Sequence, residues 1–314
     1  MIAQRYKDML SGKSVIRQIS EWSTARGTEI GYENVFDYSL GNPSVPCPEH
    51  FTKTCIDLLQ TKEPVTLHGY SPTLTIPAVR KAVAESLNRR FGMDYTADHI
   101  FMTTGAAGAL AHAVRCVGVP GQNIVTFAPF FPEYKPYIEG AGLTLRVTPP
   151  RCADFQIDFE AFAQLVDENT AAVLINSPNN PSGTAYSEET LLQLADFLTA
   201  TSAKYGHHIF LISDEPYREI SFGGRVTPYP AKFYDDTLTC YSFSKSLSVP
   251  GERIGYVAAN PRCEDAAYIV PMCGQISRGT GHNCPSSLIQ MAVERCLDVT
   301  SDLSVYETNM NLIY

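Results

Sequence analysis

Residues 240–256 read CYSFSKSLSVPGERIGY, and the rest of the chain is best interpreted outward from this stretch. The apolar run 238–243 predicts a buried strand that ends in hydroxyl residues and Lys245, with Arg253 eight residues further on. A lysine becomes a good nucleophile toward carbonyl groups when burial or a neighbouring cation disfavours its charged form. The end of a buried strand beside an arginine provides both conditions, so the pattern predicts a Schiff-base lysine at Lys245.

Two serines precede the lysine, and they extend its chemistry. Ser242 and Ser244 offer hydroxyl donors, and the Arg253 guanidinium can bind two oxygens at once, so the three form a donor set suited to a phosphate. A solvated lysine and arginine on a surface loop is the simpler alternative for an isolated S-x-S-K stretch. Here S-x-S-K is followed by R-x-G-Y, and the combination resembles the lysine motif of class I aminotransferases, the fold-type-I enzymes that use pyridoxal 5′-phosphate (PLP).

Composition limits the class of protein. The chain has 314 residues and a formal net charge of −9. This length suggests about two domains, and the lack of a basic stripe argues against a nucleic-acid partner. No signal-peptide core and no apolar segment of membrane-spanning length occurs, so we expect a cytoplasmic protein without a membrane partner. Nine cysteines without a C-x-x-C pair indicate reduced thiols, and no metal site is expected.

Apolar runs that end in polar or small-residue turns recur along the chain. They are residues 99–103, 124–127, 171–176, 209–212 and 238–243. Helical patterns stand between them, for example with apolar residues at i, i+3, i+4 and i+7 from Leu191. Strands alternating with helices indicate an α/β fold with a doubly wound, mostly parallel sheet. Such sheets bind ligands beyond the carboxyl ends of their strands.

The resemblance also implies a division of the chain. We expect an N-terminal arm that is part of a small domain (1–40), a PLP-binding large domain (41–285), and the start of an interdomain helix with a truncated C-terminal domain (286–314). Local patterns predict a strand-like run over 35–40, a Gly/Asn/Pro-rich loop over 274–285 and helices over 286–297 and 303–314. The chain stops before the family's small domain is complete, so we expect a truncated protein.

An acidic motif, SDEPY at residues 213–217, follows one of the buried runs. An acid at such a strand end needs a partner to remain ionised, and a pyridinium nitrogen is such a partner, because the protonated ring then works as an electron sink. A helix N-cap is the alternative role for Asp214. The position of D-E-P-Y before the lysine motif favours the cofactor role. The resemblance implies Tyr217 on the phenolic oxygen of the cofactor, with Lys245, Asp214 and Tyr217 as catalytic residues.

Two further motifs match the family. SPNNPSG at residues 177–183 resembles N-P-x-N-P-T-G, which implies that Asn180 contacts the cofactor's phenolic oxygen and the substrate. A strand that turns through the small residues of TGAAGAL into a helix exposes backbone N–H groups to an anion, although tight packing alone is the alternative. Gly-Ala-x-x-Ala-Leu resembles the family's phosphate cup, which assigns the cup to Gly105, Ala106 and Ala107.

Three cofactor or substrate contacts rest on the resemblance. An aromatic at Phe131 would stack on the pyridine ring, with roughly 0.5–1.5 kcal/mol beyond area burial; chemistry does not separate it from Phe130, but its spacing to the next tyrosine favours it. Tyr70 matches a tyrosine that reaches the cofactor phosphate of a neighbouring subunit, which implies a homodimer, although Thr75 replaces the family's glycine and interface packing is the alternative. Gly41 matches a glycine beside the substrate carboxylate, or forms a simple turn.

The resemblance implies an enzyme that transfers an amino group between an amino acid and a 2-oxo acid. Residues 14–17 (SVIR) are similar to a family segment near the substrate mouth. Arg17 and Arg278 are candidate contacts for the side chain of aspartate or glutamate, or else surface arginines. Alternative reactions are carbon–sulfur β-elimination and decarboxylation. Another alternative is a PLP-binding core without turnover, because nothing here matches the family's carboxylate-binding arginine.

Overall fold

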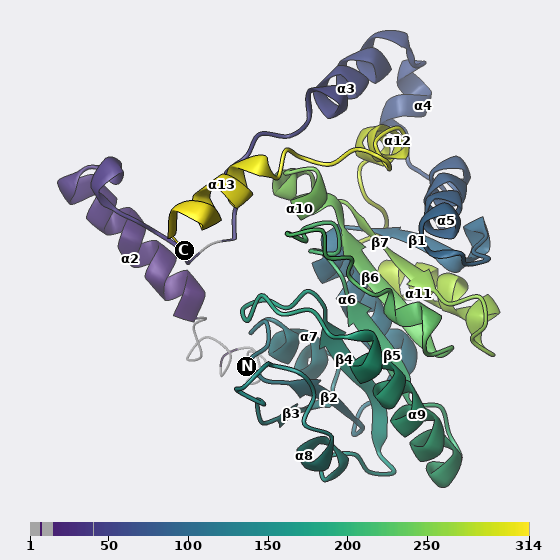
Figure 1. Ribbon diagram of the computed structural model, residues 1–314. Helices are drawn as coiled ribbons and strands as arrows, with labels where there is room; N and C mark the ends of the chain where they lie inside the picture. The colour runs from purple at the N-terminus through teal and green to yellow at the C-terminus, as the bar shows by residue number, and fades with distance from the viewer. Residues whose placement is uncertain (1–6, 8–14, 40, 314) are drawn as a thin grey trace. The chain divides into compact units, whose positions relative to one another are not determined.

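The computed structural model describes residues 7, 15–39 and 41–313 (Figure 1). The chain divides into two compact units, Met1–Ser44 and Val45–Tyr314. The first unit contains the helix α2 (Val15–Ile30) and the short 3₁₀ helix η1 (Tyr32–Asn34). The assignment of this unit to a small domain stays a prediction.

The expected strand over 35–40 is wrong. The chain from Val35 to Ser39 is irregular, and Leu40 lies outside the described residues. Phe36 and Tyr38 are 80% and 92% exposed. A strand is stable only where a neighbouring strand takes up its backbone hydrogen bonds, and no described residue of this unit belongs to a strand.

The second unit is built on one seven-stranded sheet. In chain order its strands are β1 (Ile100–Thr103), β2 (Asn123–Phe127), β3 (Thr144–Thr148), β4 (Thr170–Asn176), β5 (Phe210–Asp214), β6 (Thr237–Ser242) and β7 (Gly255–Ala259). Their order in the sheet is β1-β7-β6-β5-β4-β2-β3. Four neighbouring pairs are parallel, and β7 runs antiparallel to both β1 and β6. The predicted α/β fold with a mostly parallel sheet is confirmed.

Helices of this unit cover both faces of the sheet, although not every helix packs on it. They are α3 (Glu49–Thr61), α4 (Pro64–His68), α5 (Pro77–Phe91), α6 (Gly105–Val117), α7 (Tyr134–Gly140), α8 (Phe159–Ala163), α9 (Glu188–Tyr205), α10 (Phe243–Ser246), α11 (Ala266–Thr280), α12 (Ser287–Glu294) and α13 (Ser304–Ile313). Short 3₁₀ turns are η2 (Ala97–His99), η3 (Pro230–Lys232) and η4 (Pro250–Glu252).

Alternation along one strand shows why helices are needed on both sides. In β4 every residue is buried. Ala172 and Leu174 join the apolar cluster that includes residues of α6 and α11, whereas Val173 and Ile175 join the cluster that includes residues of α9. A strand that is apolar on both faces must be covered on both, which is the doubly wound arrangement.

Two local expectations need correction. Residues 274–280, predicted as part of a loop, form the last turns of α11. Gly274 serves packing there, because a Cβ at this position would lie 2.8 Å from the Leu74 side chain. The helix predicted over 286–297 is the shorter α12. Within the described residues, no helix combines the length and the apolarity that a membrane span requires.

The ends of the strands gather the chemical residues at one edge of the sheet. Because β7 is antiparallel, its first residue pairs with the last residues of its neighbours, Thr103 and Ser242 with Gly255. Arg253 therefore reaches this edge just before the start of a strand, and not beyond a strand's carboxyl end, where such sheets bind ligands. The predicted strand 238–243 is displaced by one residue, since Phe243 opens α10.

Candidate active site

Asp214, the last residue of β5, is the most unusual polar group at this edge. Its side chain is buried, and Oδ2 accepts a hydrogen bond of 2.6 Å from the Tyr134 hydroxyl. Its other oxygen, Oδ1, is buried without a hydrogen-bond partner among the described residues. Burial, reinforced by the nearby charge of Glu215, raises the pKa of Asp214 to about 7, although the bond from Tyr134 acts in the opposite direction.

Lys245 lies in the short helix α10, which directly follows β6, the strand next to β5 in the sheet. Ser242 caps this short helix by accepting a 3.2 Å hydrogen bond from the Ser244 backbone N–H. Burial, and then the positive charge of Arg253, lower the pKa of Lys245. Both causes increase the fraction of neutral, nucleophilic amine at a given pH.

Tyr217 and Asn180 come together beside this lysine. The Asn180 amide donates a 3.2 Å hydrogen bond from Nδ2 to the Tyr217 hydroxyl. Lys245 Nζ is 6.0 Å from the centre of the Tyr217 ring. Asn180 itself is held in place because its backbone N–H donates to Asn176 Oδ1 at 2.6 Å. The structure thus unites three residues that the sequence predicted on three separate segments.

The start of α6 faces Ser242 and Arg253. Gly105 has a left-handed φ of +76°, and a Cβ there would lie 3.3 Å from Arg253 Nη2 and 3.6 Å from Ser242 Oγ. Thr104, the N-cap, makes no side-chain cap hydrogen bond. A glycine is therefore needed both for the backbone angle and for the close approach of the guanidinium. Ala106 and Ala107 follow in the first turn of α6, where small side chains leave backbone donors accessible.

The aromatic candidates lie beside Tyr134, the donor to Asp214. The Phe131 ring meets Tyr134 edge-on at 5.8 Å, and the Phe130 ring stacks on it at 6.3 Å. Both phenylalanines are partly buried. Their contacts place them next to the acid, but the assignment of ring stacking to Phe131 stays a prediction.

Four further predictions concern Tyr70, Gly41, Arg278 and the segment 14–17. Tyr70 is 98% exposed, between α4 and α5. Gly41 belongs to the other compact unit. Arg278, on α11, donates a 3.2 Å hydrogen bond to the Gln275 side chain. Ser14 and the side chain of Arg17 lie outside the described residues.

Comparison with known proteins identifies the chain's family. Residues 33–311 match the family described as aminotransferase class I and II. The chain belongs to this family. An aminotransferase from Eubacterium rectale, whose crystal structure is known, is 41% identical, with a TM-score of 0.96 over 100% of this chain and 79% of that one.

Two curated relatives show the range of activities among similar proteins. The probable aspartate/prephenate aminotransferase of Aquifex aeolicus (strain VF5) is 32% identical over 242 residues, which make up 75% of this chain and 59% of that protein. The S-alkyl-thiohydroximate lyase of Arabidopsis thaliana is 34% identical over 230 residues, 70% of this chain and 47% of the lyase. The matched part of this aminotransferase-family chain thus spans less than two thirds of both relatives.

The class I and II aminotransferases use PLP, and the residues present fit that cofactor. The buried Asp214 Oδ1 is an acceptor without a donor among the described residues, and the N–H of a pyridinium ring is a donor that would fit it. At the other end of the site, a phosphate fits the donors of Ser242, Arg253 and the start of α6, where a Cβ on Gly105 would crowd the guanidinium. Lys245 lies in sequence between Ser242 and Arg253, and its Nζ is on the side of the Tyr217 ring.

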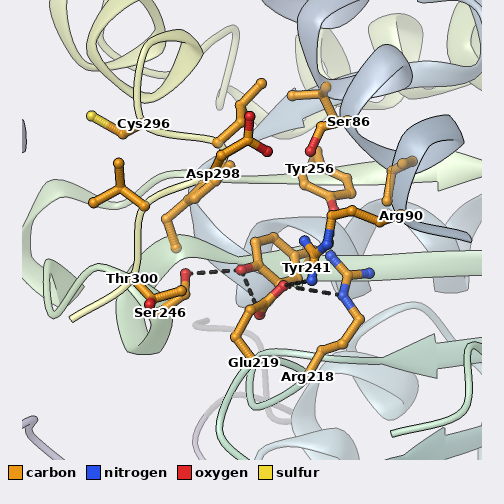
Figure 2. A pocket seen from close by; sticks show the side chains of 15 residues that line it. Ser86, Arg90, Arg218, Glu219, Tyr241, Ser246, Tyr256, Cys296, Asp298 and Thr300 are labelled. Atoms are coloured by element: carbon orange, nitrogen blue, oxygen red, sulfur yellow. Dashed lines mark hydrogen bonds and ion pairs between the residues drawn. The ribbon is translucent and has the colours of Figure 1, made fainter. Parts of the chain in front are cut away.

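Sequence reasoning missed how much of the surroundings is charged. Tyr134 was used only as a spacing marker for Phe131, although it donates directly to Asp214. Arg218 and Glu219, which follow Tyr217, are both buried as ion-paired side chains. They line a pocket of about 300 Å³ that is not lined by Asp214, Tyr217 or Lys245 (Figure 2). The available signal was the adjacent pair of opposite charges shortly after the apolar strand β5, which indicates a buried ion pair.

Proposed function

We propose that this chain forms the cofactor-binding core of a PLP-dependent aminotransferase, which transfers an amino group between an amino acid and a 2-oxo acid. The observation that carries the proposal is the buried Asp214 oxygen, which has no hydrogen-bond partner in the described part of the chain and lies at the same sheet edge as a lysine whose pKa is lowered. Family membership supports the reaction type.

Lys245 is the covalent attachment residue for the cofactor in this proposal. When bound, PLP supplies a carbonyl that accepts the amino group and a cationic ring that withdraws electrons from the reacting carbon. Because burial and Arg253 lower the pKa of Lys245, its Nζ can be neutral and can take up and return a proton at the substrate's α-carbon. Lys245 is then both anchor and general acid–base.

The other residues hold and orient the cofactor. Asp214 accepts from the ring nitrogen, while Asn180 and Tyr217, already 3.2 Å apart, donate to the phenolic oxygen. Burial, then the charge of Asp214, raise the pKa of Tyr217, so its hydroxyl keeps its proton and remains a donor. Phe131 stacks on the ring. The phosphate is assigned to Gly105, Ala106, Ala107, Ser242, Ser244 and Arg253.

Several parts of the proposal concern the assembled protein. Gly41 is assigned to the substrate carboxylate, and Asn180 to the substrate as well as to the cofactor. Tyr70 is assigned to the cofactor phosphate of a second subunit in a homodimer, and its 98% exposure in one chain is compatible with this role. The division at 41–285 and the cytoplasmic location remain predictions from the sequence.

The amino donor is proposed to be aspartate or glutamate. The name of the Aquifex aeolicus relative gives aspartate for that protein. Arg17 and Arg278 are the candidate contacts for its side chain. The 34% identity to a lyase favours carbon–sulfur β-elimination as the second candidate reaction. Decarboxylation and a PLP-binding core without turnover are the further alternatives.

The first experiment is an absorbance spectrum of the purified protein with PLP between 300 and 500 nm, followed by a panel of amino acids. We expect a band that is absent in Lys245→Ala and that particular amino acids convert to the pyridoxamine form, with turnover reduced in the variant by at least about 1,000-fold. Release of a thiol or of carbon dioxide would instead support the alternative reactions. A lysine-dependent band that no amino acid changes would indicate a core without turnover, and no band would contradict the proposal.

A further inference from the structure

The pocket described above is walled by a buried network of charges and hydroxyl groups (Figure 2). Arg218 is at its centre: Nη1 donates to Glu215 Oε2 at 3.0 Å, and Nη2 donates to the Tyr256 hydroxyl at 2.8 Å. Its Nε lies 3.3 Å from Glu219 Oε1, which also accepts a 2.7 Å bond from Arg90. The network continues from Glu219 toward the lysine segment.

Tyr241 is the residue that makes this continuation. Its hydroxyl lies 2.8 Å from Glu219 Oε2 and 2.8 Å from Ser246 Oγ. Burial acts to raise the pKa of Glu219, but Arg218 and Arg90 outweigh it and hold that pKa below its usual value, so the carboxylate is ionised. A phenol has one proton and an ionised carboxylate only accepts, so Tyr241 donates to Glu219 and the Ser246 hydroxyl completes the second contact as donor.

The two ends of this chain of contacts are next to the two sides of the active site. Glu219 is two residues after Tyr217, and Ser246 directly follows Lys245. We propose that Glu219, Tyr241 and Ser246 form a positioning relay that holds the Lys245 segment in register with the Tyr217 segment. The relay rests on the proposed function, because its purpose is to set the distance between the attachment lysine and the residues that bind the cofactor's phenolic oxygen.

Hydrogen bonds are needed to position the Lys245 segment because side-chain packing around these three residues is incomplete on the side of the pocket. Tyr241, Ser246 and Glu219 all line the pocket of about 300 Å³, so they face space and not a close-packed neighbour on that side. The Ser246 carbonyl accepts a 2.7 Å bond from the Ser301 backbone N–H, which fixes the backbone after the lysine. Its hydroxyl contact with Tyr241 ties this backbone back to β6, the strand that leads into α10, and the bond from Tyr241 to Glu219 then joins β6 to the Tyr217 segment.

The test compares two buried tyrosines that differ in one contact. Tyr241→Phe removes the hydroxyl between Glu219 and Ser246. The matched control Tyr256→Phe removes a hydroxyl that accepts from Arg218 and that, among the described residues, makes no hydrogen bond to Ser246. The two rings stack on each other at 4.9 Å, and both are buried, so a purely structural loss would affect them alike. Ser246→Ala breaks the same link from the other end.

The readouts are the pH midpoint of the PLP absorbance change, the dissociation constant of PLP, and the thermal midpoint of the cofactor-free protein. We expect Tyr241→Phe and Ser246→Ala each to weaken PLP binding about fivefold and to move the pH midpoint of the absorbance change by about half a pH unit. Both effects have the size expected for the loss of one hydrogen bond. The double variant should be no worse than either single variant, because both break one link.

Tyr256→Phe should lower the thermal midpoint without moving the spectral midpoint. Equal spectral midpoints in Tyr241→Phe, Ser246→Ala and the wild type, with a lysine-dependent band present in all, would overturn the relay and leave the proposed function standing. A shift in Tyr256→Phe as large as in Tyr241→Phe would also overturn it. Absence of the band in the wild-type protein would overturn the proposed function, and the relay with it. If Tyr241→Phe does not fold, Ser246→Ala alone decides between these outcomes.

Discussion

Asp214 and Glu219 are carboxyl groups five positions apart on one segment, the first buried and the second with a side chain 9% exposed, and their surroundings differ sharply. Glu219 contacts two guanidinium groups and one phenol, and these partners hold its pKa below the usual value despite burial. Asp214 has one hydrogen bond from Tyr134, an oxygen without a partner within the described part of the chain, and a pKa raised to about 7.

This difference separates structural roles from ligand-binding roles. A buried acid whose oxygens are all paired within the chain stabilises the fold only as part of its network. A buried acid with an unpaired oxygen costs folding free energy and remains ready for a cationic donor from outside the chain. Glu215, bonded to Arg218 and Ser213 but with a raised pKa, is an intermediate case in which burial is the larger effect.

The largest expected effect is on the paired acid. Glu219→Gln leaves Arg218 with one fewer buried counter-charge, and we expect a loss of about 3–5 kcal/mol in the free energy of unfolding. Glu49→Gln is the matched control, because Glu49 pairs with Lys53 at 2.8 Å on an exposed surface and should lose about 1 kcal/mol or less. Denaturant unfolding at pH 7 measures both. Equal losses would show that the buried network is no more important than a surface pair.

The unpaired acid should respond in the opposite direction in cofactor-free protein. Because the pKa of Asp214 is raised from 3.8 to about 7 in the folded state, the folded protein holds this proton more tightly than the unfolded chain does. The carboxyl therefore lowers stability progressively from about pH 4 to about pH 7, and fully above that.

Asp214→Asn removes this pH dependence. We expect the variant to be more stable than the wild type by up to about 4 kcal/mol at pH 8, and by less than half of that at pH 5, because a shift of roughly three pH units corresponds to this range. Urea unfolding of cofactor-free protein at the two pH values provides the measurement. A variant that is less stable than the wild type at pH 8 would indicate that Asp214 is internally paired, like Glu219.

The smallest expected effect concerns the one hydrogen bond that Asp214 does have. Tyr134→Phe removes it, so we expect a loss of about 1 kcal/mol and an Asp214 pKa still further above its ordinary value. Tyr95→Phe serves as control, since Tyr95 is an equally buried phenol bonded at 2.8 Å to Tyr229. Only Tyr134→Phe should shift the pH range over which the stability changes to higher pH. An unchanged range would be evidence against this contact.

Much of the fold and of the site could be predicted because strand ends carry recognisable motifs. The apolar runs before Asp214, Asn180 and Ser242 are β5, β4 and β6, and the parallel register brings their ends together. Arg253 could not be placed in this way, because β7 reverses direction and nothing local in GERIGY shows that. Long-range pairing decided its position.

Backbone geometry and distant contacts were the other limits. Thr75 is buried and has a left-handed φ of +71°, at the position where the family pattern has glycine. A threonine side chain gives no indication of such a backbone angle. The glycines of α11 suggested a loop, yet Gly274 lies inside a helix because Leu74, two hundred residues earlier, packs against it. Arg218 and Glu219 find partners on other elements, Tyr256 for the first and Arg90 and Tyr241 for the second, and the local sequence does not show these contacts.

The central claim is that Asp214 Oδ1, which has no partner among the described residues, marks the cofactor site. The most direct test measures the dissociation constant of PLP for the wild type and for Asp214→Asn at pH 7.5, with the lysine-dependent absorbance band as the signal. We predict that Asp214→Asn binds PLP about 10- to 100-fold more weakly, as expected for the loss of a hydrogen bond to a charged group, even though the cofactor-free variant is the more stable protein. Equal affinities in the two proteins would contradict the claim.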